Sequence, residues 1–337
     1  MKFPSLNPRS LNRAKGVAGE IHGSGRYKRN LLILHTQDQQ ARSDWETVKA
    51  TIEARAPDIE VRIDSNVSPS PGIERWQVSR PSLVFSPFRL VAYRPPAGKV
   101  YAGREIGKIA EWRRFVEFNL PVPRTVRLVP ELQLEPEIWG EYVVVKPVKG
   151  ERGQGVRLMR RGDVAERYAG LTENGRRRML VQEFIDNVDD ENRPTHYRAL
   201  TMFGEPLSLR AISWTDPRPP LAKIAADPIG AIASNADEIP GGDTIVNIPE
   251  VLALSRRVAA AFAEIPCLGQ DIVRRAGTGE LFILETNSGG ATWHFSSAAH
   301  ADYIGHNEEY FRARYDQFGA LGVVADQLIA RTRAEAE

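Results

Sequence analysis

The chain has 337 residues, of which 42% are hydrophobic and 26% are charged, as in globular proteins with a substantial core. Its formal net charge of +2 at pH 7 does not indicate a nucleic-acid-binding protein, and its single cysteine, Cys267, excludes a disulfide framework and a multi-cysteine zinc site. No stretch has the ~18 consecutive apolar residues of a membrane span, and the N-terminus lacks an apolar signal segment. We therefore expect a cytoplasmic protein without nucleic-acid or membrane partners, and the sequence leaves a homo-oligomer open.

Residues 1–29 are polar and basic, with seven Lys or Arg side chains against one acid, Glu20. This composition predicts a flexible arm, and a docking arm for an anionic partner is the alternative. Residues 30–103 then predict a small open α/β subdomain, because apolar strand-like runs alternate with a helical stretch. The predicted strands are 31–34, 59–63 and 83–88, and the helix carries Trp45, Val48 and Ile52 on one face.

Residues 104–185 predict a first, smaller lobe. Ile109, Trp112 and Val116 recur at helical spacing, which predicts a helix over 104–119 with these side chains as its apolar stripe. The following residues, 124–183, are typical of a strand-rich segment with one helix near 163–176.

Residues 186–337 predict a larger second lobe. Two strands joined at Gly204-Glu205 are expected within 195–213. The stretch 215–249 is rich in Pro, Gly, Asp and Asn and predicts a long loop. A helix over 249–264, a hairpin over 268–287 and a helical C-terminus over 306–335 follow.

The predicted hairpin brings two acidic residues together. Gly277-Thr278-Gly279 is typical of a tight turn, and folding about it pairs Arg275 with Leu281 and Asp271 with Glu285. Opposed residues have Cβ atoms about 4.5–5.5 Å apart, so the two carboxylates repel unless a cation lies between them. Asn287 follows Glu285 by two residues and shares its face. Oxygen ligands of this kind suit Mg²⁺; the alternative is a different register with exposed acids.

A strand ending in a lysine precedes a glycine-rich loop. Residues 142–147 form the β-branched strand, with Lys146 near its end, and Gly150, Gly153 and Gly155 follow. The glycines allow backbone N–H groups to approach phosphate oxygens, and the lysine adds positive charge. Neither a Walker A loop nor a dinucleotide fingerprint is present. A flexible hairpin loop with solubilising charges is the alternative.

The order of these motifs resembles the ATP-grasp superfamily over roughly residues 100–300. The resemblance implies an α/β fold of the ATP-grasp type, preceded by the small N-terminal subdomain. Five elements carry it in order: Lys146-Pro147, the Gly150–Gly155 loop, Gln182-Glu183-Phe184-Ile185, Asp271, and Glu285-Thr286-Asn287.

The resemblance implies an ATP site. Lys146 would contact the α-phosphate, and the loop would cover the β- and γ-phosphates. The segment Gln182 to Ile185, here called the hinge, would contact adenine largely through its backbone, with Glu183 contributing its side chain. The remaining candidates are Gln182, Phe184 and Ile185 in the hinge, Asp189 and Asp190 for the ribose, and Lys108 as a second ATP-contacting lysine. A surface position is the alternative for Lys108.

The resemblance also implies Mg²⁺ and substrate contacts. Asp271, Glu285 and Asn287 would hold Mg²⁺, with Glu285 placed to bridge two ions. Arg210, and next Arg198, would contact a phosphate or acyl phosphate; surface positions are the alternative. The segment after Asn287 resembles the glycine-containing loop of D-alanine–D-alanine ligases, with substrate candidates Ser288, Gly289, Gly290, His294, Ser296 and Ser297.

One position departs from that pattern. Many ligases of this type carry an arginine two residues before the metal aspartate, where this chain has Gly269. The leading interpretation is nevertheless an ATP- and Mg²⁺-dependent ligase that activates a small-molecule or peptide carboxylate as an acyl phosphate and joins it to an amine or another nucleophile. A kinase for a small-molecule hydroxyl and a non-catalytic nucleotide-binding module are the alternatives.

Overall fold

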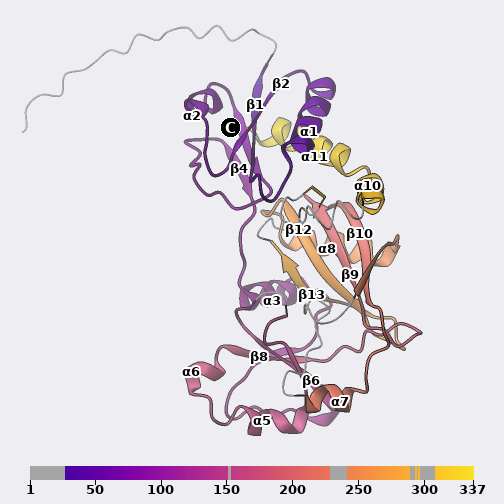
Figure 1. Ribbon diagram of the computed structural model, residues 1–337. Coiled ribbons are helices and arrows are strands. Elements are labelled where there is room, and N and C mark those ends of the chain that lie inside the picture. Colours follow the sequence, from indigo (N-terminus) through magenta and orange to yellow (C-terminus); the bar gives the residue numbers. More distant parts are fainter. Residues whose placement is uncertain (1–26, 151–152, 228–240, 289–292, 294, 297–307) are drawn as a thin grey trace, which may run out of the picture.

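Three β-sheets follow one another along the length of the molecule (Figure 1). The computed structural model describes residues 27–150, 153–227, 241–288, 293, 295–296 and 308–337. The expected α/β class is confirmed, with several sheets and helices packed on them. Within the described ranges, no helix combines the length and apolar character that crossing a membrane requires.

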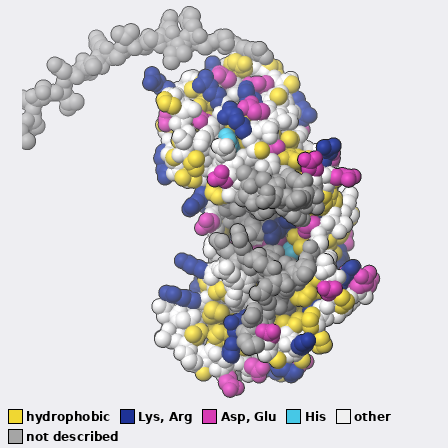
Figure 2. Space-filling model, in the orientation of Figure 1, with side chains coloured by type: hydrophobic (Ala, Val, Ile, Leu, Met, Phe, Trp, Pro, Cys, Tyr) yellow, Lys and Arg dark blue, Asp and Glu magenta, His cyan; other side chains and the backbone are white. Residues whose placement is uncertain are grey.

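The N-terminal unit is a four-stranded parallel sheet in the order β2-β1-β3-β4. Its strands are β1 (Arg29–His35), β2 (Ile59–Ser65), β3 (Ser82–Ser86) and β4 (Lys99–Ala102), and its helices are α1 (Arg42–Arg55) and α2 (Ile73–Gln77). The apolar face predicted for α1 is confirmed, because Trp45, Val48 and Ile52 are fully buried. Figure 2 shows positive and negative side chains interspersed over this unit.

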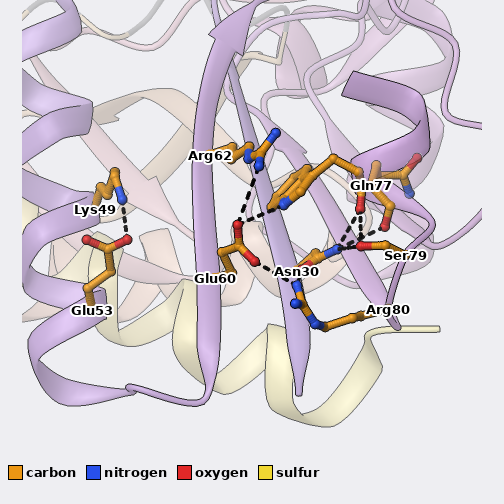
Figure 3. A network of polar contacts seen from close by, with 9 residues as sticks. Asn30, Lys49, Glu53, Glu60, Arg62, Gln77, Ser79 and Arg80 are labelled. Atoms are coloured by element: carbon orange, nitrogen blue, oxygen red, sulfur yellow. Dashed lines mark hydrogen bonds and ion pairs between the residues drawn. The ribbon is translucent and has the colours of Figure 1, made fainter. Parts of the chain in front are cut away.

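A network of polar contacts connects strands and a helix of this unit (Figure 3). Asn30 donates to the backbone carbonyl of Trp76 at 2.7 Å and accepts from Arg80 at 2.9 Å. Glu60 accepts from Arg80 at 2.6 Å and from the Trp76 indole at 2.9 Å. The guanidinium of Arg62 lies over the Trp76 ring, 4.6 Å from its centroid. The network thus joins β1, β2 and α2 through the ion pair of Glu60 with Arg80 and through hydrogen bonds of the Asn30 amide.

The end of the chain returns to this first unit. The helices α10 (Glu308–Asp316) and α11 (Ala320–Glu335) are separated at Gly319, which has a left-handed φ of 65°. Helix α11 packs against α1 and the parallel sheet, and its Val324 and Leu328 share one core with Trp45. Leu200 of the central sheet belongs to the same core, so the two units are packed together.

The central sheet has five antiparallel strands in the order β11-β10-β9-β12-β13, and α8 packs against it. Its elements are β9 (Thr195–Met202), β10 (Glu205–Trp214), β11 (Gly241–Ile245), α8 (Pro249–Ala261), β12 (Cys267–Arg274) and β13 (Leu281–Asn287). The long loop predicted over 215–249 is wrong in part, because it contains α7 (Leu221–Ala226) and β11. Strand β11 is formed by pairing with β10, which local composition does not reveal.

The third sheet is antiparallel, in the order β5-β8-β6-β7. Its strands are β5 (Thr125–Arg127), β6 (Tyr142–Pro147), β7 (Arg157–Arg160) and β8 (Met179–Glu183), with short helices α4 (Pro136–Trp139), α5 (Val164–Arg167) and α6 (Glu173–Arg176). The single helix predicted near 163–176 is wrong, since two separate one-turn helices form there.

Helix α3 (Lys108–Glu117) lies between the third sheet and the central sheet (Figure 1). Its predicted apolar stripe is wrong: the buried side chains are Glu111 and Phe115, whereas Val116 is 53% exposed. Phe115 packs edge-on against Phe262, with ring centroids 5.7 Å apart. The helix is therefore rotated so that a carboxylate faces inward.

Candidate active site

A row of four charged residues runs across the central sheet. Arg210 opposes Arg198, Arg198 opposes Asp271, and Asp271 opposes Glu285. Opposed residues of neighbouring strands project from the same face, so the structure brings the two arginines and the two acids together. This face lies opposite the one that packs Leu209 against the core of α8.

The predicted pairing of Asp271 with Glu285 is confirmed, and the remainder of the predicted register is wrong. Arg274, rather than Arg275, opposes Leu281, and Arg275 bonds to the carbonyl of Glu280 at 2.8 Å. A bulge next to Asp271 takes up one residue of β13, which explains the shift.

One ion pair lies within the row, and two others join its ends to neighbouring side chains. Arg198 forms a two-pronged contact with Asp271, through Nε to Oδ1 and through Nη2 to Oδ2 at 2.9 Å. The amide of Asn287 donates to Oδ2 of Asp271 at 3.3 Å. Arg210 pairs with Asp243, and Lys108 Nζ lies 3.9 Å from Glu285 Oε2. The three predicted Mg²⁺ ligands are thus neighbours.

Their donor types fit a hard cation, since Asp271 and Glu285 supply carboxylate oxygens and Asn287 an amide oxygen. In the described ranges, no cluster of three or more His, Cys, Asp or Glu residues offers a competing metal site. Arg198 engages both oxygens of Asp271, so a cation bound there would share that carboxylate with a guanidinium.

A narrow cleft lies between α3, the third sheet and β13. Lys146 is only 9% exposed there, and its Nζ donates to Gln182 Oε1 at 3.0 Å. Gln182 Nε2 in turn donates to Thr125 Oγ1 at 2.9 Å. The side chains that line the cleft include Lys108, Glu111, Trp112, Thr125, Lys146, Leu180, Gln182 and Glu285.

Burial shifts the pKa of two ionisable groups in the cleft. It lowers the pKa of Lys146 to about 8, with Lys108 adding to the effect and Glu285 opposing it. Burial raises the pKa of Glu111 to about 7, although the hydrogen bonds from Thr286 oppose that rise. The cleft therefore holds an ammonium and a carboxyl group that both titrate near neutral pH.

Glu111, Asp243 and His196 were missed by sequence reasoning. Burial and the neighbouring Arg198 and Arg210 lower the pKa of His196 to about 3, so its imidazole is neutral beside the row. Glu111 has the sequence pattern of a solvated charge on an amphipathic helix. Its place one turn after Lys108 is the only local signal that could have singled it out.

The predicted adenine hinge is only partly in the cleft. Gln182 lines it, whereas the Glu183 carboxylate accepts from Arg275 Nη2 at 2.6 Å. Phe184 lies under the guanidinium of Arg218, 5.8 Å from its ring centroid. The other candidates of this segment are Ile185, which is buried, Asp189, which accepts from the side chain and backbone of Arg193, and Asp190, which is exposed.

The glycine-rich loop joins β6 and β7. Gly153 and Gly155 have φ values of 73° and 72°, which favour glycine, and a Cβ on Gly150 would approach Pro147 to 3.1 Å. Residues 151–152 lie outside the described ranges.

The substrate candidates after Asn287 are described only in part. Ser288 is buried, and its carbonyl accepts from the backbone N–H of Arg104 at 2.9 Å. The hydroxyl of Ser296 is bonded to the Asp44 carboxylate, which also accepts from the Trp293 indole at 2.9 Å. The predicted residues outside the described ranges are Gly289, Gly290, His294 and Ser297.

Comparisons with known proteins identify the architecture. No protein-family model matches the sequence, and comparison with curated proteins finds no match. A solved structure of the ATP-grasp ligase PsnB with its minimal precursor is 17% identical, covers 90% of this chain and 99% of its own, and has a TM-score of 0.51. PsnB with a phosphomimetic precursor variant, Mg and ADP also has a TM-score of 0.51 at 17% identity, over 91% of this chain and 99% of its own.

A third structure is less similar. The D-alanine–D-alanine ligase from Bacillus anthracis is 13% identical, with a TM-score of 0.42, and the match covers 89% of this chain and 99% of that one. At such identities the likeness is one of fold, and it rests on the two structures with TM-scores above 0.5.

Proposed function

Since the chain has the ATP-grasp fold, we propose that it is an ATP- and Mg²⁺-dependent ligase. It would activate a carboxylate as an acyl phosphate and join it to an amine or another nucleophile, releasing ADP and phosphate. The observation that carries the proposal is the row Arg210–Arg198–Asp271–Glu285 next to a cleft that contains Lys146. Phosphoryl transfer depends mainly on positioning and on neutralising charge, and this arrangement offers groups for both.

Two lysines are the proposed phosphate contacts. Lys146 and Lys108 both line the cleft, and neither is committed to a close ion pair: Lys146 bonds to an amide, and Lys108 lies 3.9 Å from Glu285. The loop carrying Gly153 and Gly155 begins directly after the strand that holds Lys146, which suits a cover over the outer phosphates. The segment from Gln182 to Ile185 is the proposed adenine contact.

Asp271, Glu285 and Asn287 are the proposed Mg²⁺ ligands. When bound, Mg²⁺ would neutralise phosphate oxygens during transfer. Arg198 would then be released in part from Asp271 and could contact the acyl phosphate. It would thereby take the place of the arginine that many such ligases carry at the position of Gly269. Arg210, next to Arg198, is the second candidate for that contact.

The reaction consists of two displacements. A substrate carboxylate oxygen bonds to the γ-phosphorus while the bond to the β–γ bridging oxygen breaks and ADP leaves. The nucleophile then attacks the acyl carbon, loses its proton, and phosphate departs with the electrons of the carbon–oxygen bond. The arginines would stabilise the negative charge that develops on the transferring group.

A screen for ADP and phosphate release from Mg-ATP, against amino acids, dipeptides and organic acids, tests this function. Glu285→Gln should reduce ADP release below detection, because an amide oxygen replaces a charged ligand. Glu280→Gln, an exposed acid in the same hairpin, is the matched control and should keep wild-type turnover. Full turnover in Glu285→Gln would contradict the proposal. A stable phosphorylated product without free phosphate would instead indicate a kinase.

A further inference from the structure

A buried carboxylate contacts the segment that carries two of the proposed metal ligands. Glu111 of α3 is 5% exposed, and its Oε1 accepts from the backbone N–H of Thr286 at 2.6 Å and from the Thr286 hydroxyl at 2.5 Å. Thr286 stands between Glu285 and Asn287 on β13, the edge strand of the central sheet. One carboxylate oxygen therefore takes both donors of the residue in the middle of the segment.

The contact of Glu111 with Thr286 is important because Thr286 lies on an edge strand. Among the strands that the structure describes, β13 pairs with β12 alone, and the bulge next to Asp271 interrupts that pairing close to Glu285. On its other side, the backbone N–H of Ile283 donates to the carbonyl of Pro121 at 2.8 Å. An edge strand with a bulge has fewer hydrogen bonds to fix its position than a central strand. Glu111 supplies a bond to the outward-facing amide of Thr286 where a further strand would otherwise do so.

Helix α3 meets this region at three successive turns. Lys108 lies 3.9 Å from Glu285, Glu111 bonds to Thr286, and Phe115 packs on Phe262. All three side chains line the cleft, and Phe115 also anchors the helix in the core. The same helix thus carries the proposed phosphate contact Lys108 and contacts the proposed metal segment through Glu111.

We propose that Glu111 is a positioning residue that fixes Glu285 and Asn287 for metal binding by holding Thr286 against α3. This inference rests on the proposed function, because it needs Mg²⁺ to bind at that segment. Groups that orient metal ligands typically change metal affinity by about 10- to 100-fold when they are removed. Glu111 would act on the metal-dependent part of nucleotide binding.

Calorimetric titration of the full chain with ADP, with and without Mg²⁺, tests the inference. For wild type, Mg²⁺ should tighten ADP binding. In Glu111→Ala, the Mg²⁺ concentration for half-maximal tightening should rise about tenfold relative to wild type. Glu111→Gln keeps one acceptor oxygen for Thr286 and should recover most of the effect. Glu117→Ala, an exposed acid on the same helix, should match wild type.

Thr286→Val keeps the fold-forming backbone and removes only the hydroxyl donor, so it should give an intermediate shift even if Glu111→Ala unfolds. A Mg²⁺ midpoint unchanged from wild type in both Glu111→Ala and Thr286→Val would overturn the inference and leave the proposed function intact. Equal losses with and without Mg²⁺ in folded Glu111→Ala would also overturn it. A wild-type protein whose ADP binding is insensitive to Mg²⁺ would overturn both proposals.

Discussion

Two polar regions of the molecule satisfy their charges in different ways. In the N-terminal unit, Glu60 meets the opposite charge of Arg80 at 2.6 Å and also accepts from Trp76 (Figure 3). In the cleft, Lys146 donates to a neutral amide and Glu111 accepts from a neutral threonine. Both regions are hydrogen-bonded, yet Glu60 has a cationic partner, whereas the hydrogen-bond partners of Lys146 and Glu111 are neutral.

The difference separates a contact that stabilises a fold from one that holds charge for a ligand. A buried charge with neutral partners costs more than a paired one, and the cost appears as a shifted pKa for both Lys146 and Glu111. Groups of this kind concentrate at functional sites. The comparison therefore supports the cleft, rather than the N-terminal network, as the place where a charged ligand binds.

The largest effect is expected at Lys146. Lys146→Met removes the buried ammonium and should weaken ATP binding by about 10- to 100-fold, the loss expected for a hydrogen bond from a charged donor. Lys223→Met, at an exposed position of α7, should leave the affinity unchanged. Fluorescence titration with a labelled ATP analogue measures both. Equal affinities for Lys146→Met and wild type would remove the distinction between the two regions.

A second effect should appear in the pH dependence of stability. Burial lowers the pKa of Lys146 to about 8 from its usual 10.5, so the folded protein loses this proton before the unfolded chain does. The free energy of unfolding should therefore rise between pH 8 and 10.5, by about 1–3 kcal/mol relative to Lys146→Met. Urea denaturation of both proteins at pH 7.5 and 10 measures the difference. A gap that stays constant with pH would mean that the ammonium is not desolvated.

The smallest expected effect lies in the N-terminal unit. Glu60→Ala leaves Arg80 and the Trp76 indole without their carboxylate and should lower the free energy of unfolding by about 1–2 kcal/mol, because the network is only partly exposed. Affinity for ATP should stay within twofold. Chemical denaturation and the same titration test both halves. A selective loss of ATP binding without destabilisation would contradict the contrast between the regions.

Local signals predicted the acidic pair of the site, but not the register that forms it. The turn at Gly277-Thr278-Gly279 predicted Asp271 opposite Glu285, whereas the observed pairing of Arg274 with Leu281 would place Leu284 there if β13 had no bulge. The bulge one residue further on was not predictable, since no local residue marks it. The contact of Arg198 with Asp271 depends on how β9 pairs with β12, about 70 residues later in the chain.

Tertiary contacts decided what the sequence pattern left open. The apolar spacing of Ile109, Trp112 and Val116 was present, but the core next to Phe262 accepted Phe115 instead. Strand β4 was not predicted, because four residues with one buried side chain form a strand only beside β3. Glu111 could not be recognised for the same reason: its partner, Thr286, lies 175 residues away.

The return of α11 to the N-terminal unit has a consequence for synthesis on the ribosome. Trp45, Val48 and Ile52 lie in one core with Val324 and Leu328 of α11. This core is therefore incomplete until α11 has emerged from the ribosome. The N-terminal unit is therefore completed only after both later sheets have been translated. A nascent chain would carry that apolar surface uncovered through the synthesis of both later sheets, which is the period when a chaperone would have something to bind.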